Sequence, residues 1–392
     1  METHAGDPRA FDRLDLDRLP SPCFVVDEVA LETNLRTLAD VANRSGATVL
    51  AALKAFSMWS VAPAVGTHLG GTCASGLWEA RLGRREYGGT LTTYSPAFRA
   101  DEIDEIIELS DHVVFNSPAQ HRRFAANIEA ARRRGSSVDV GLRINPEHSE
   151  AEVARYDPAA PGSRLGHPVS RLCAEDLVGV DGLHVHSLCE QDLPPLLRTW
   201  AAVEPFIAPF TDGLRWINLG GGHHITRRDY DRDGLVDFVR ALADSTGCEI
   251  HLEPGEAVAL DAGILVGEVL DVIDVAENGE PIAILDVSAT CHMPDVLEAP
   301  YRPALLGEAG DTTVRLGGPS CLAGDVIGDY SFVGPPEVGR RLAFLDQAHY
   351  SMVKTTTFNG VGLPAIALWN SDTDDLRIVK RFDYDDFKGR LS

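Results

Sequence analysis

The first two-thirds of the chain alternates short runs of β-forming residues with longer stretches that carry apolar residues at helical spacing. Gly, Pro, Asn or Ser bounds each short run, so the alternation predicts repeated β/α units. Eight units over about 230 residues match the size of a closed parallel barrel. The eight predicted strands are Thr48–Leu53, Gly71–Ala74, Thr90–Tyr94, His112–Asn116, Val138–Ile144, Gly182–His186, Arg215–Leu219 and Glu249–Leu252.

Helices are predicted between these strands and before the first of them. The segment Asp27–Asn43 precedes the first strand, with Asp27 as a suitable N-cap. The segment Ala119–Arg134 carries arginines toward its end, where they suit the helix dipole.

Beyond Pro254 the pattern changes to closely spaced strands with turn residues between them. The extended segment Ser21–Val26 can pair with these later strands. The predicted fold is α/β: a (β/α)8 barrel over residues 28–257, followed by an all-β sandwich or barrel over 258–392 that takes in residues 1–27. The later strands are predicted at Ile264–Val275, Ile282–Val287, Arg341–Asp346, Pro364–Trp369 and Leu376–Phe382.

Composition is that of a soluble globular protein. The chain has 392 residues, 44% of them hydrophobic, and no apolar run near the roughly 20 residues that span a bilayer. Met1–Asp17 lacks the apolar core of a secretion signal, and seven cysteines without a C-x-x-C pair are typical of reduced thiols. We therefore expect a cytoplasmic protein with no membrane partner.

The net charge of the chain limits the kinds of molecule that it can bind. Lysine and arginine number 35 against 59 aspartates and glutamates, a formal charge of −24. This excess would repel nucleic acid and could steer a polycationic substrate inward, although acidity also serves solubility alone.

Polar residues gather at the ends of the predicted barrel strands, where the active sites of such barrels lie. A lysine at the edge of an apolar interior is partly desolvated, which favours the neutral amine that a Schiff base requires. It could equally extend its ammonium into solvent. The residues at the eight strand ends are Lys54, Ser75, Ser95, Asn116, Arg143, His186, Gly220–Gly222 and Glu253.

Two other strand ends suggest a cofactor. Three consecutive glycines, Gly220–Gly222, let backbone N–H groups approach a phosphate, and a flexible turn would also explain them. Glu253 could keep a pyridine nitrogen protonated, or it could be an ordinary capping or ion-paired residue.

His186 lies in a His-x-His pair and could stack on a planar ring, but the same spacing occurs in metal sites of barrel hydrolases. Further ligands for a metal could come from His223, His224 and His251. In the second domain Cys321 sits between glycine-rich turns, where it could donate a proton or simply be a small packed residue.

With these residues assembled, the chain resembles the alanine-racemase-like, fold-type III family of pyridoxal-phosphate enzymes, and most closely the carboxynorspermidine/carboxyspermidine decarboxylases. The resemblance runs nearly end to end. The motifs that carry it include Leu53–Ser60, Phe115–Ser117, Gly141–Pro146, Ser163–Gly166, Gly182–Glu190, Asn218–Thr226, Glu253–Glu256, Ala289–Glu298, Tyr301–Pro303, Cys321–Asp325 and His349–Tyr350.

The resemblance implies roles for individual residues. Lys54 would hold pyridoxal phosphate covalently, and Glu253 would pair with its ring nitrogen. His186 would stack on the ring, and Cys321, supplied by the partner subunit of a homodimer, would protonate the substrate carbon. The catalytic residues are thus Lys54, His186 and Cys321, and the cofactor contacts are Lys54, Arg143, His186, Gly220, Gly221, Gly222, Glu253 and Tyr350, with no metal.

Departures from related enzymes bear on the substrate. Glu256 stands where ornithine decarboxylases have an arginine, and Leu322 stands where ornithine and diaminopimelate decarboxylases have a carboxylate after the cysteine. Burying a distal ammonium without that partner is costly, so those two substrates are disfavoured. The expected substrate contacts are Asp295, Glu298 and Asp325.

The expected reaction is decarboxylation of carboxynorspermidine or carboxyspermidine to norspermidine or spermidine, in polyamine biosynthesis. One alternative is a decarboxylase of another amino acid or carboxylated amine. A metal-dependent barrel hydrolase is a more remote one. A catalytically idle relative is disfavoured because Lys54, Glu253 and Cys321 are all present, and no second base for racemisation is identified.

Overall fold

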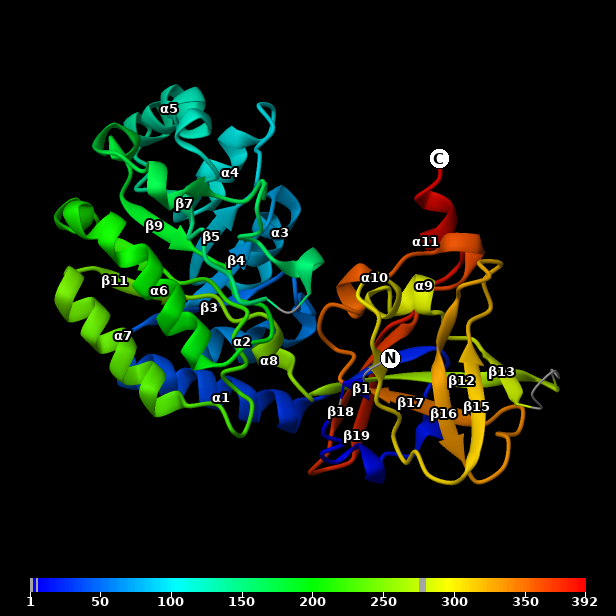
Figure 1. Ribbon diagram of the computed structural model, residues 1–392. Helices are drawn as coiled ribbons and strands as arrows, with labels where there is room; N and C mark the ends of the chain where they lie inside the picture. Colours follow the sequence, from blue (N-terminus) through cyan, green and yellow to red (C-terminus); the bar gives the residue numbers. More distant parts are fainter. Residues whose placement is uncertain (1–2, 5, 152, 275–279) are drawn as a thin grey trace. The chain divides into compact units, whose positions relative to one another are not determined.

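The computed structural model describes residues 3–4, 6–151, 153–274 and 280–392 (Figure 1). Val275, the last residue of one predicted strand, lies outside the described residues, as does Met1 of the N-terminal segment. The chain divides into two compact units, one made of Met1–Thr33 with Ala259–Ser392 and the other of Asn34–Val258.

The unit Asn34–Val258 contains a closed barrel of eight parallel strands. Their order is β3-β4-β5-β6-β7-β9-β10-β11, closed by pairing between β11 and β3, and the short β8 (His167–Pro168) adds to β7. The predicted barrel is confirmed, and no predicted strand end differs by more than one residue. The strands are β3 Thr48–Ala52, β4 Gly71–Ala74, β5 Thr90–Tyr94, β6 His112–Phe115, β7 Asp139–Asn145, β9 Gly182–Val185, β10 Trp216–Asn218 and β11 Glu249–Leu252.

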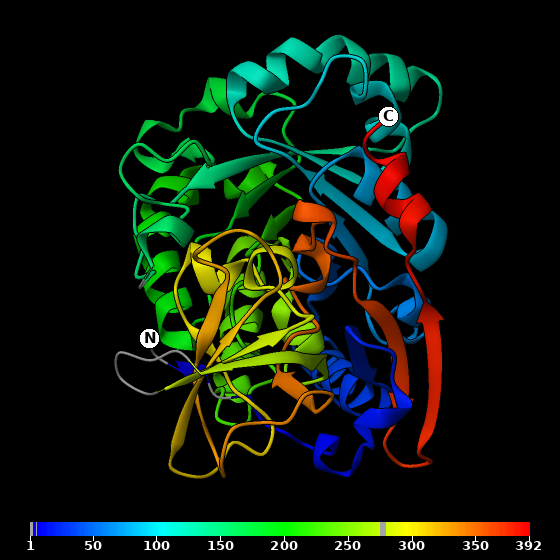
Figure 2. The same cartoon turned by 90° about the vertical axis from the view of Figure 1, so that its right-hand side faces the viewer.

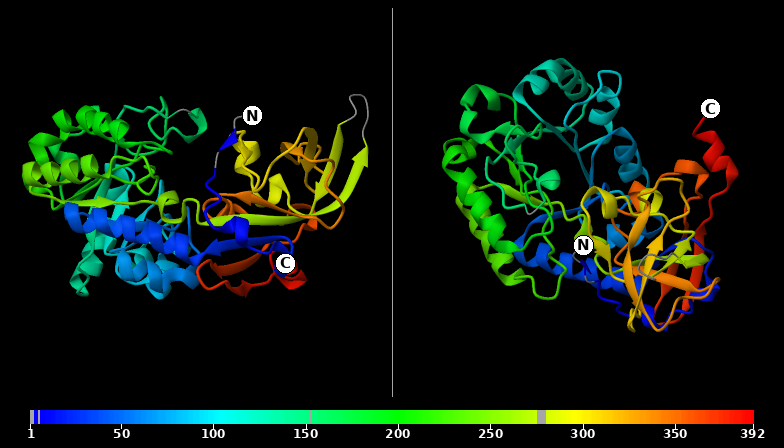
Figure 3. Two further views of the ribbon diagram at one scale, coloured as in Figure 1. Left: turned by 90° about the horizontal axis from the view of Figure 1, so that it is seen from below. Right: turned by 45° about the vertical axis from the view of Figure 1, so that its right-hand side comes forward.

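Helices lie outside these strands, as Figures 1 and 3 show for α6 and α7. The amide of Val29 donates to Asp27 Oδ1 at 3.1 Å, so Asp27 caps α1 as predicted. Ser117 caps α5 by accepting from the amide of Gln120. The helices are α1 Glu28–Ser45, α2 Ala62–His68, α3 Leu77–Leu82, α4 Ile103–Leu109, α5 Pro118–Arg133, α6 Leu193–Ile207, α7 Arg232–Thr246 and α8 Glu256–Ala259.

Aromatic rings fill the barrel near the N-terminal ends of its strands. The ring of Trp216 lies parallel to that of His251, with centroids 5.6 Å apart, and His112 lies 5.1 Å from both. A Cβ on Gly182 would come within 2.1 Å of the Trp216 ring, so this strand position requires glycine. These rings therefore fill the barrel interior near this end of the strands.

The other unit is built on an eight-stranded mixed sheet of order β16-β15-β13-β12-β2-β18-β19, with β17 also paired to β12. Strand β2 pairs with β12 and β18, as predicted for Ser21–Val26. The antiparallel pair β18–β19 is the red pair of strands in Figure 2. The strands are β2 Cys23–Asp27, β12 Gly263–Asp274, β13 Pro281–Leu285, β15 Thr312–Gly317, β16 Val326–Phe332, β17 Arg341–Leu345, β18 Ala365–Asn370 and β19 Asp375–Lys380, and β1 Thr3–His4 pairs separately with β14 Arg302–Pro303.

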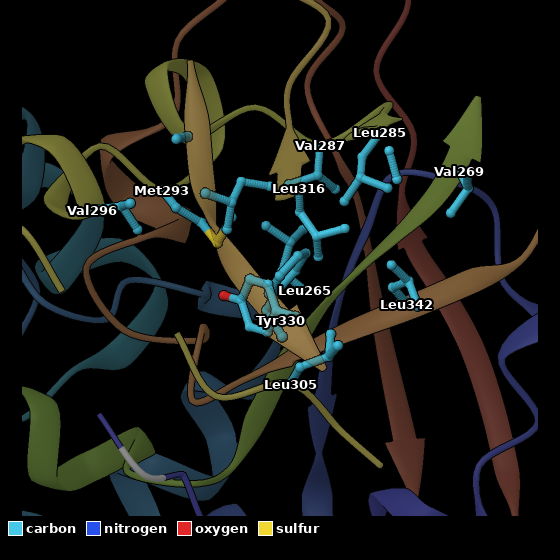
Figure 4. Packing of buried hydrophobic residues seen from close by; sticks show 14 of the residues in the cluster. Leu265, Val269, Leu285, Val287, Met293, Val296, Leu305, Leu316, Tyr330 and Leu342 are labelled. Carbon is cyan, nitrogen blue, oxygen red and sulfur yellow. The ribbon is translucent and has the colours of Figure 1, made fainter. Parts of the chain in front are cut away.

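The sheet buries a core on each face because neighbouring residues of a strand point to opposite sides. On β12, Leu265 and Val269 join one cluster, shown in Figure 4, whereas Ile264 and Val266 join the other. In the second cluster Phe11 packs on Trp369 with ring centroids 5.7 Å apart. This unit also holds three short helices, α9 Ala289–His292, α10 Asp295–Glu298 and α11 Tyr384–Gly389.

Two further expectations concern the whole described chain. All seven cysteines are described and each is a free thiol. None of the helices in the described ranges combines the length and apolar character needed to cross a bilayer.

Candidate active site

Lys54 lies just beyond β3 at the C-terminal end of the barrel. The backbone around it is tied to both neighbouring strands, since the amide of Leu53 donates to Cys73 O and that of Ala52 to Pro254 O, both at 3.0 Å. Lys54 itself lies in the turn that directly follows β3. Its Nζ lies 3.4 Å from His186 Nε2.

Glu253 follows β11, and its side chain is 11% exposed. Asn218 Nδ2 donates to its Oε1 at 2.7 Å, and His184 Nε2 lies 3.3 Å from its Oε2. Burial alone would raise the pKa of Glu253, but His184, Asn218 and the charge of Lys54 outweigh it and lower the pKa to about 2. The structure therefore holds a fixed negative charge at the barrel mouth.

His186 lies beside Lys54 as a neutral ring. Burial lowers the pKa of His186 well below its ordinary value, and the charges of Lys54 and Arg143 lower it further. Its Nδ1 lies 3.1 Å from Gly221 O, and Arg143 donates to its backbone oxygen at 2.9 Å. The imidazole is thus held in one position next to the amine.

The turn Gly220–Gly222 passes very close to neighbouring backbone. A Cβ on Gly221 would lie 2.1 Å from Glu253 O, and one on Gly222 would lie 2.0 Å from Leu188 O. The amide of Gly220 donates to Asn218 Oδ1 at 2.8 Å. Only glycine fits at these positions, because the neighbouring backbone leaves no room for a Cβ. Phosphate binding by this turn stays a prediction.

Sequence reasoning missed a supporting group around Arg143. The guanidinium of Arg143 lies over the Tyr94 ring, 4.5 Å from its centroid, and Tyr94 donates to Asn116 Oδ1 at 2.7 Å. Asn116 also donates to Arg164 O and accepts from the amide of Gly166. Strand alternation could have revealed this group. Tyr94 on β5 and Arg143 on β7 both fall on the side of their strand that faces the barrel interior.

The two serines of the strand-end set make local contacts instead. The amide of Ser75 donates to Glu79 Oε2, and Ser95 Oγ donates to Ala97 O.

The histidines named for a metal do not converge on His186 within the described residues. His251 stacks on Trp216 near the other end of the barrel, and His223 contacts the Tyr230 hydroxyl at 3.2 Å. His224 lies with Glu190 and Glu256 in a group that could hold a metal ion, with ligand atoms all within 4.8 Å of one another, and His186, His223 and His251 do not belong to it among the described residues. The His-x-His pair therefore does not form the metal site that the barrel-hydrolase alternative requires.

The remaining predicted residues belong to the sheet-bearing unit. Cys321 is exposed, and its amide donates to Asn359 Oδ1 at 2.8 Å. The neighbouring Leu322 is 44% exposed. An exposed thiol is available to a reacting group, as the predicted proton donor must be.

Asp325 is buried beneath the Cys321 loop. Ser288 Oγ donates to its carboxylate at 2.8 Å, and the amides of Thr290 and Ser320 donate at 3.2 Å. These contacts favour a role in holding the loop. Direct substrate contact by Asp325 stays a prediction.

Tyr350 lies in a turn stabilised by its neighbours. The backbone φ of Tyr350 is +48°, and its backbone carbonyl oxygen accepts a hydrogen bond from the amide of Lys354 at 3.0 Å. The adjacent His349 lies 3.0 Å from Asp346 Oδ1. The turn is thus fixed, whereas the contact of Tyr350 with the cofactor stays a prediction.

Asp295 and Glu298 lie one turn apart on α10 and share a partner. Lys354 Nζ donates to Asp295 Oδ1 at 2.5 Å and to Glu298 Oε2 at 2.9 Å. The two predicted substrate contacts therefore form an ammonium-binding pair.

The barrel mouth has the groups that pyridoxal phosphate requires. Lys54 supplies an amine for the aldehyde, the ionised Glu253 supplies a partner for a protonated ring nitrogen, and His186 supplies a flat neutral ring beside the amine. The residues present fit the cofactor. The fold and this site define a barrel enzyme of the pyridoxal-phosphate class.

Comparison with known proteins specifies the class further. Residues 23–348 match the family model described as "Pyridoxal-dependent decarboxylase, C-terminal sheet domain". The chain is 40% identical to carboxyaminopropylagmatine decarboxylase of Synechocystis sp., covering 96% of each chain. It is 37% identical to carboxynorspermidine/carboxyspermidine decarboxylase of Campylobacter jejuni, covering 95% of this chain and 99% of that one.

A solved structure agrees with these relatives. Carboxynorspermidine decarboxylase from Campylobacter jejuni, in complex with norspermidine, superposes with a TM-score of 0.86 at 37% identity and covers 95% of this chain and 100% of its own. The chain belongs to the pyridoxal-dependent decarboxylases, in the carboxynorspermidine/carboxyspermidine decarboxylase family. The predicted family, cofactor and enzyme class are confirmed.

Proposed function

We propose that this chain decarboxylates a carboxylated linear polyamine, carboxynorspermidine or carboxyspermidine, in polyamine biosynthesis. The observation that carries the proposal is the presence of Lys54 and an ionised Glu253 at the C-terminal end of the barrel, in a chain whose near-full-length relatives are named for such substrates. Bound pyridoxal phosphate supplies the electron sink that accepts the electron pair of the departing carboxylate.

The residues of the chain then have separate tasks. Lys54 would hold the cofactor and take it back as the product amine leaves, and Glu253 would keep a proton on the ring nitrogen. His186 would lie against the ring, and Arg143 fixes His186 by donating to its backbone oxygen. The thiol of Cys321 returns a proton to the carbon that has lost its carboxylate.

A second candidate substrate is carboxyaminopropylagmatine, which ends in a guanidinium. It is favoured by the 40% identity to the Synechocystis enzyme. Both candidates present a distal cation, which suits the acidic pair Asp295 and Glu298. The lack of a carboxylate at Leu322 disfavours short diamino acids in either case.

The test is carbon dioxide release from a panel of substrates: carboxynorspermidine, carboxyspermidine, carboxyaminopropylagmatine, lysine, ornithine and diaminopimelate. We expect the first three to exceed the last three in kcat/KM. A preference for lysine, ornithine or diaminopimelate would contradict the proposal. The ranking among the first three decides between the two candidate substrate types.

We further infer a cytoplasmic homodimer in which Cys321 acts on the site of the other subunit. Mixing inactive Lys54→Ala and Cys321→Ala proteins under conditions that exchange subunits is expected to restore about a quarter of wild-type activity, because half the dimers are hybrids and each has one intact site of two. Each variant mixed with itself serves as the control. No recovery after confirmed exchange would place Cys321 at the site of its own subunit, and a Cys321→Ala protein that is active by itself would place Cys321 outside the reaction.

A further inference from the structure

His184, the first histidine of the His-x-His pair, lies beside both residues that would flank the cofactor ring. On β9 it is the register partner of Arg143 on β7 and of Asn218 on β10. Its Nε2 lies 3.3 Å from Glu253 Oε2, and its ring lies nearly parallel to that of His186, with centroids 6.3 Å apart. Only 2% of the His184 side chain is exposed. His184 therefore links Glu253 to His186 from inside the barrel.

The two oxygens of the Glu253 carboxylate have different partners. Asn218 Nδ2 donates to Oε1 at 2.7 Å, and His184 faces Oε2. A partner on each oxygen restrains the rotation of the carboxylate plane, which a single partner would leave much freer. His184 thus helps to determine how Glu253 presents its oxygens to a ring nitrogen.

The proton of the His184 ring has one suitable position. Burial lowers the pKa of His184, and the opposing charge of Glu253 does not outweigh it, so the ring is neutral and carries a single N–H. An unprotonated Nε2 would direct its lone pair at a carboxylate oxygen, whereas a protonated Nε2 can donate to that oxygen. We therefore assign the proton to Nε2.

Burial and His184 act on Glu253 in opposite directions. Burial by itself raises the pKa of Glu253, and His184 makes the largest contribution that lowers it. Without His184 the effect of burial is less opposed, so the carboxyl would take up a proton at a higher pH. A protonated carboxyl cannot stabilise a positive charge on a ring nitrogen. The other charged or titratable groups that act on Glu253 are Lys54 after β3, Cys73 on β4 and Arg143 on β7.

We propose that His184 is a positioning residue that keeps the Glu253 carboxylate ionised and oriented toward the ring nitrogen of the cofactor. The inference rests on the cofactor chemistry of the proposed function and makes no use of the substrate. It gives the two histidines of the His-x-His pair separate tasks. His186 would lie against the cofactor ring, and His184 acts on the ring only through Glu253.

His184→Phe tests the proposal because phenylalanine keeps a buried ring beside His186 but offers Glu253 no donor. The readout is the dissociation constant of pyridoxal phosphate, measured by titrating the apoenzyme at a series of pH values and following the absorption of the cofactor. At neutral pH we expect this constant to rise about tenfold over wild type, the scale of one hydrogen bond to a charged group. The ratio to wild type should grow as the pH falls, by up to about tenfold per pH unit, because one carboxyl takes up one proton.

Three further variants isolate the contact between His184 and Glu253. His184→Gln carries an amide donor near the position of Nε2 and should return the ratio toward one at every pH. His121→Phe removes another buried imidazole of the same unit, which stacks on Phe115 with centroids 5.6 Å apart, and should bind the cofactor like wild type. A double variant that combines His184→Phe with Glu253→Gln should bind weakly and show no added pH dependence, because position 253 then has no carboxyl to protonate.

A ratio of one for His184→Phe at every pH would overturn the proposal. So would a loss of affinity that is equal at every pH, or an added pH dependence that persists in the double variant, because neither could come from the ionisation of Glu253. If His184→Phe does not fold, His184→Asn, whose shorter amide cannot reach Oε2, replaces it. If cofactor binding follows these expectations but no carboxylated polyamine is decarboxylated, the proposed function fails and the role of His184 stands.

Discussion

Lys54→Ala is expected to reduce decarboxylation on the order of 10⁴-fold, because the variant loses both the amine that binds the cofactor and the group that releases the product. The purified variant should also lack the visible absorption of covalently bound pyridoxal phosphate. Steady-state carbon dioxide release and an absorption spectrum of the protein check the two losses separately. The Lys54 side chain is exposed and adds no core contact, so the thermal midpoint should change little.

Lys380→Ala is the matched control, since it removes a lysine from the surface of the other unit. It should keep both activity and colour. A coloured, active Lys54→Ala protein would place the cofactor on another amine and would remove the basis of the proposed function.

Glu253→Gln is expected to lower kcat by 10²–10³-fold, about the effect of removing one preorganised electrostatic group. Glutamine keeps the shape and can still contact Asn218, but it cannot hold a positive charge on the ring nitrogen. Because the pKa of Glu253 is lowered to about 2, the wild-type carboxylate is ionised at any pH at which the enzyme would be assayed. The acid limb of its pH profile therefore reports some other group.

Cofactor absorption should persist in Glu253→Gln, which separates this defect from that of Lys54→Ala. Glu253→Asp keeps the charge at a greater distance and should recover part of the rate. Wild-type kcat in Glu253→Gln, measured with saturating cofactor, would show that the carboxylate only supports His184 and Asn218.

Much of the fold follows from local pattern. The barrel strands are short β-forming runs between turn residues, so their positions can be predicted to within a residue. Strands β15 and β16 escaped prediction because Gly317, Gly328 and Asp329 resemble turn residues in sequence. Their place in the sheet depends on pairing with each other and with β13, which no local pattern reveals.

The candidate site was only partly readable in the same way. Because Lys54, His186 and Glu253 each follow a barrel strand, the sequence predicts that they lie close together. The structure shows Lys54 beside His186. The partners that set their charge, His184 and Asn218, lie one or two strands away and become visible only when the barrel closes. The ion pairs of Lys354 span more than 50 residues, so no local pattern could anticipate them.

The stack of His112, Trp216 and His251 has a consequence for the evolution of substrate length. Because these rings fill the barrel interior, no part of a long amine substrate can extend from the C-terminal ends of the strands into the barrel. Every added methylene or nitrogen must be housed above the strand ends, among loops that can lengthen, shorten or exchange residues without disturbing the strands. Related enzymes can thus share the same barrel and the same chemistry, while their loops select triamines, guanidino amines or short diamino acids as substrates.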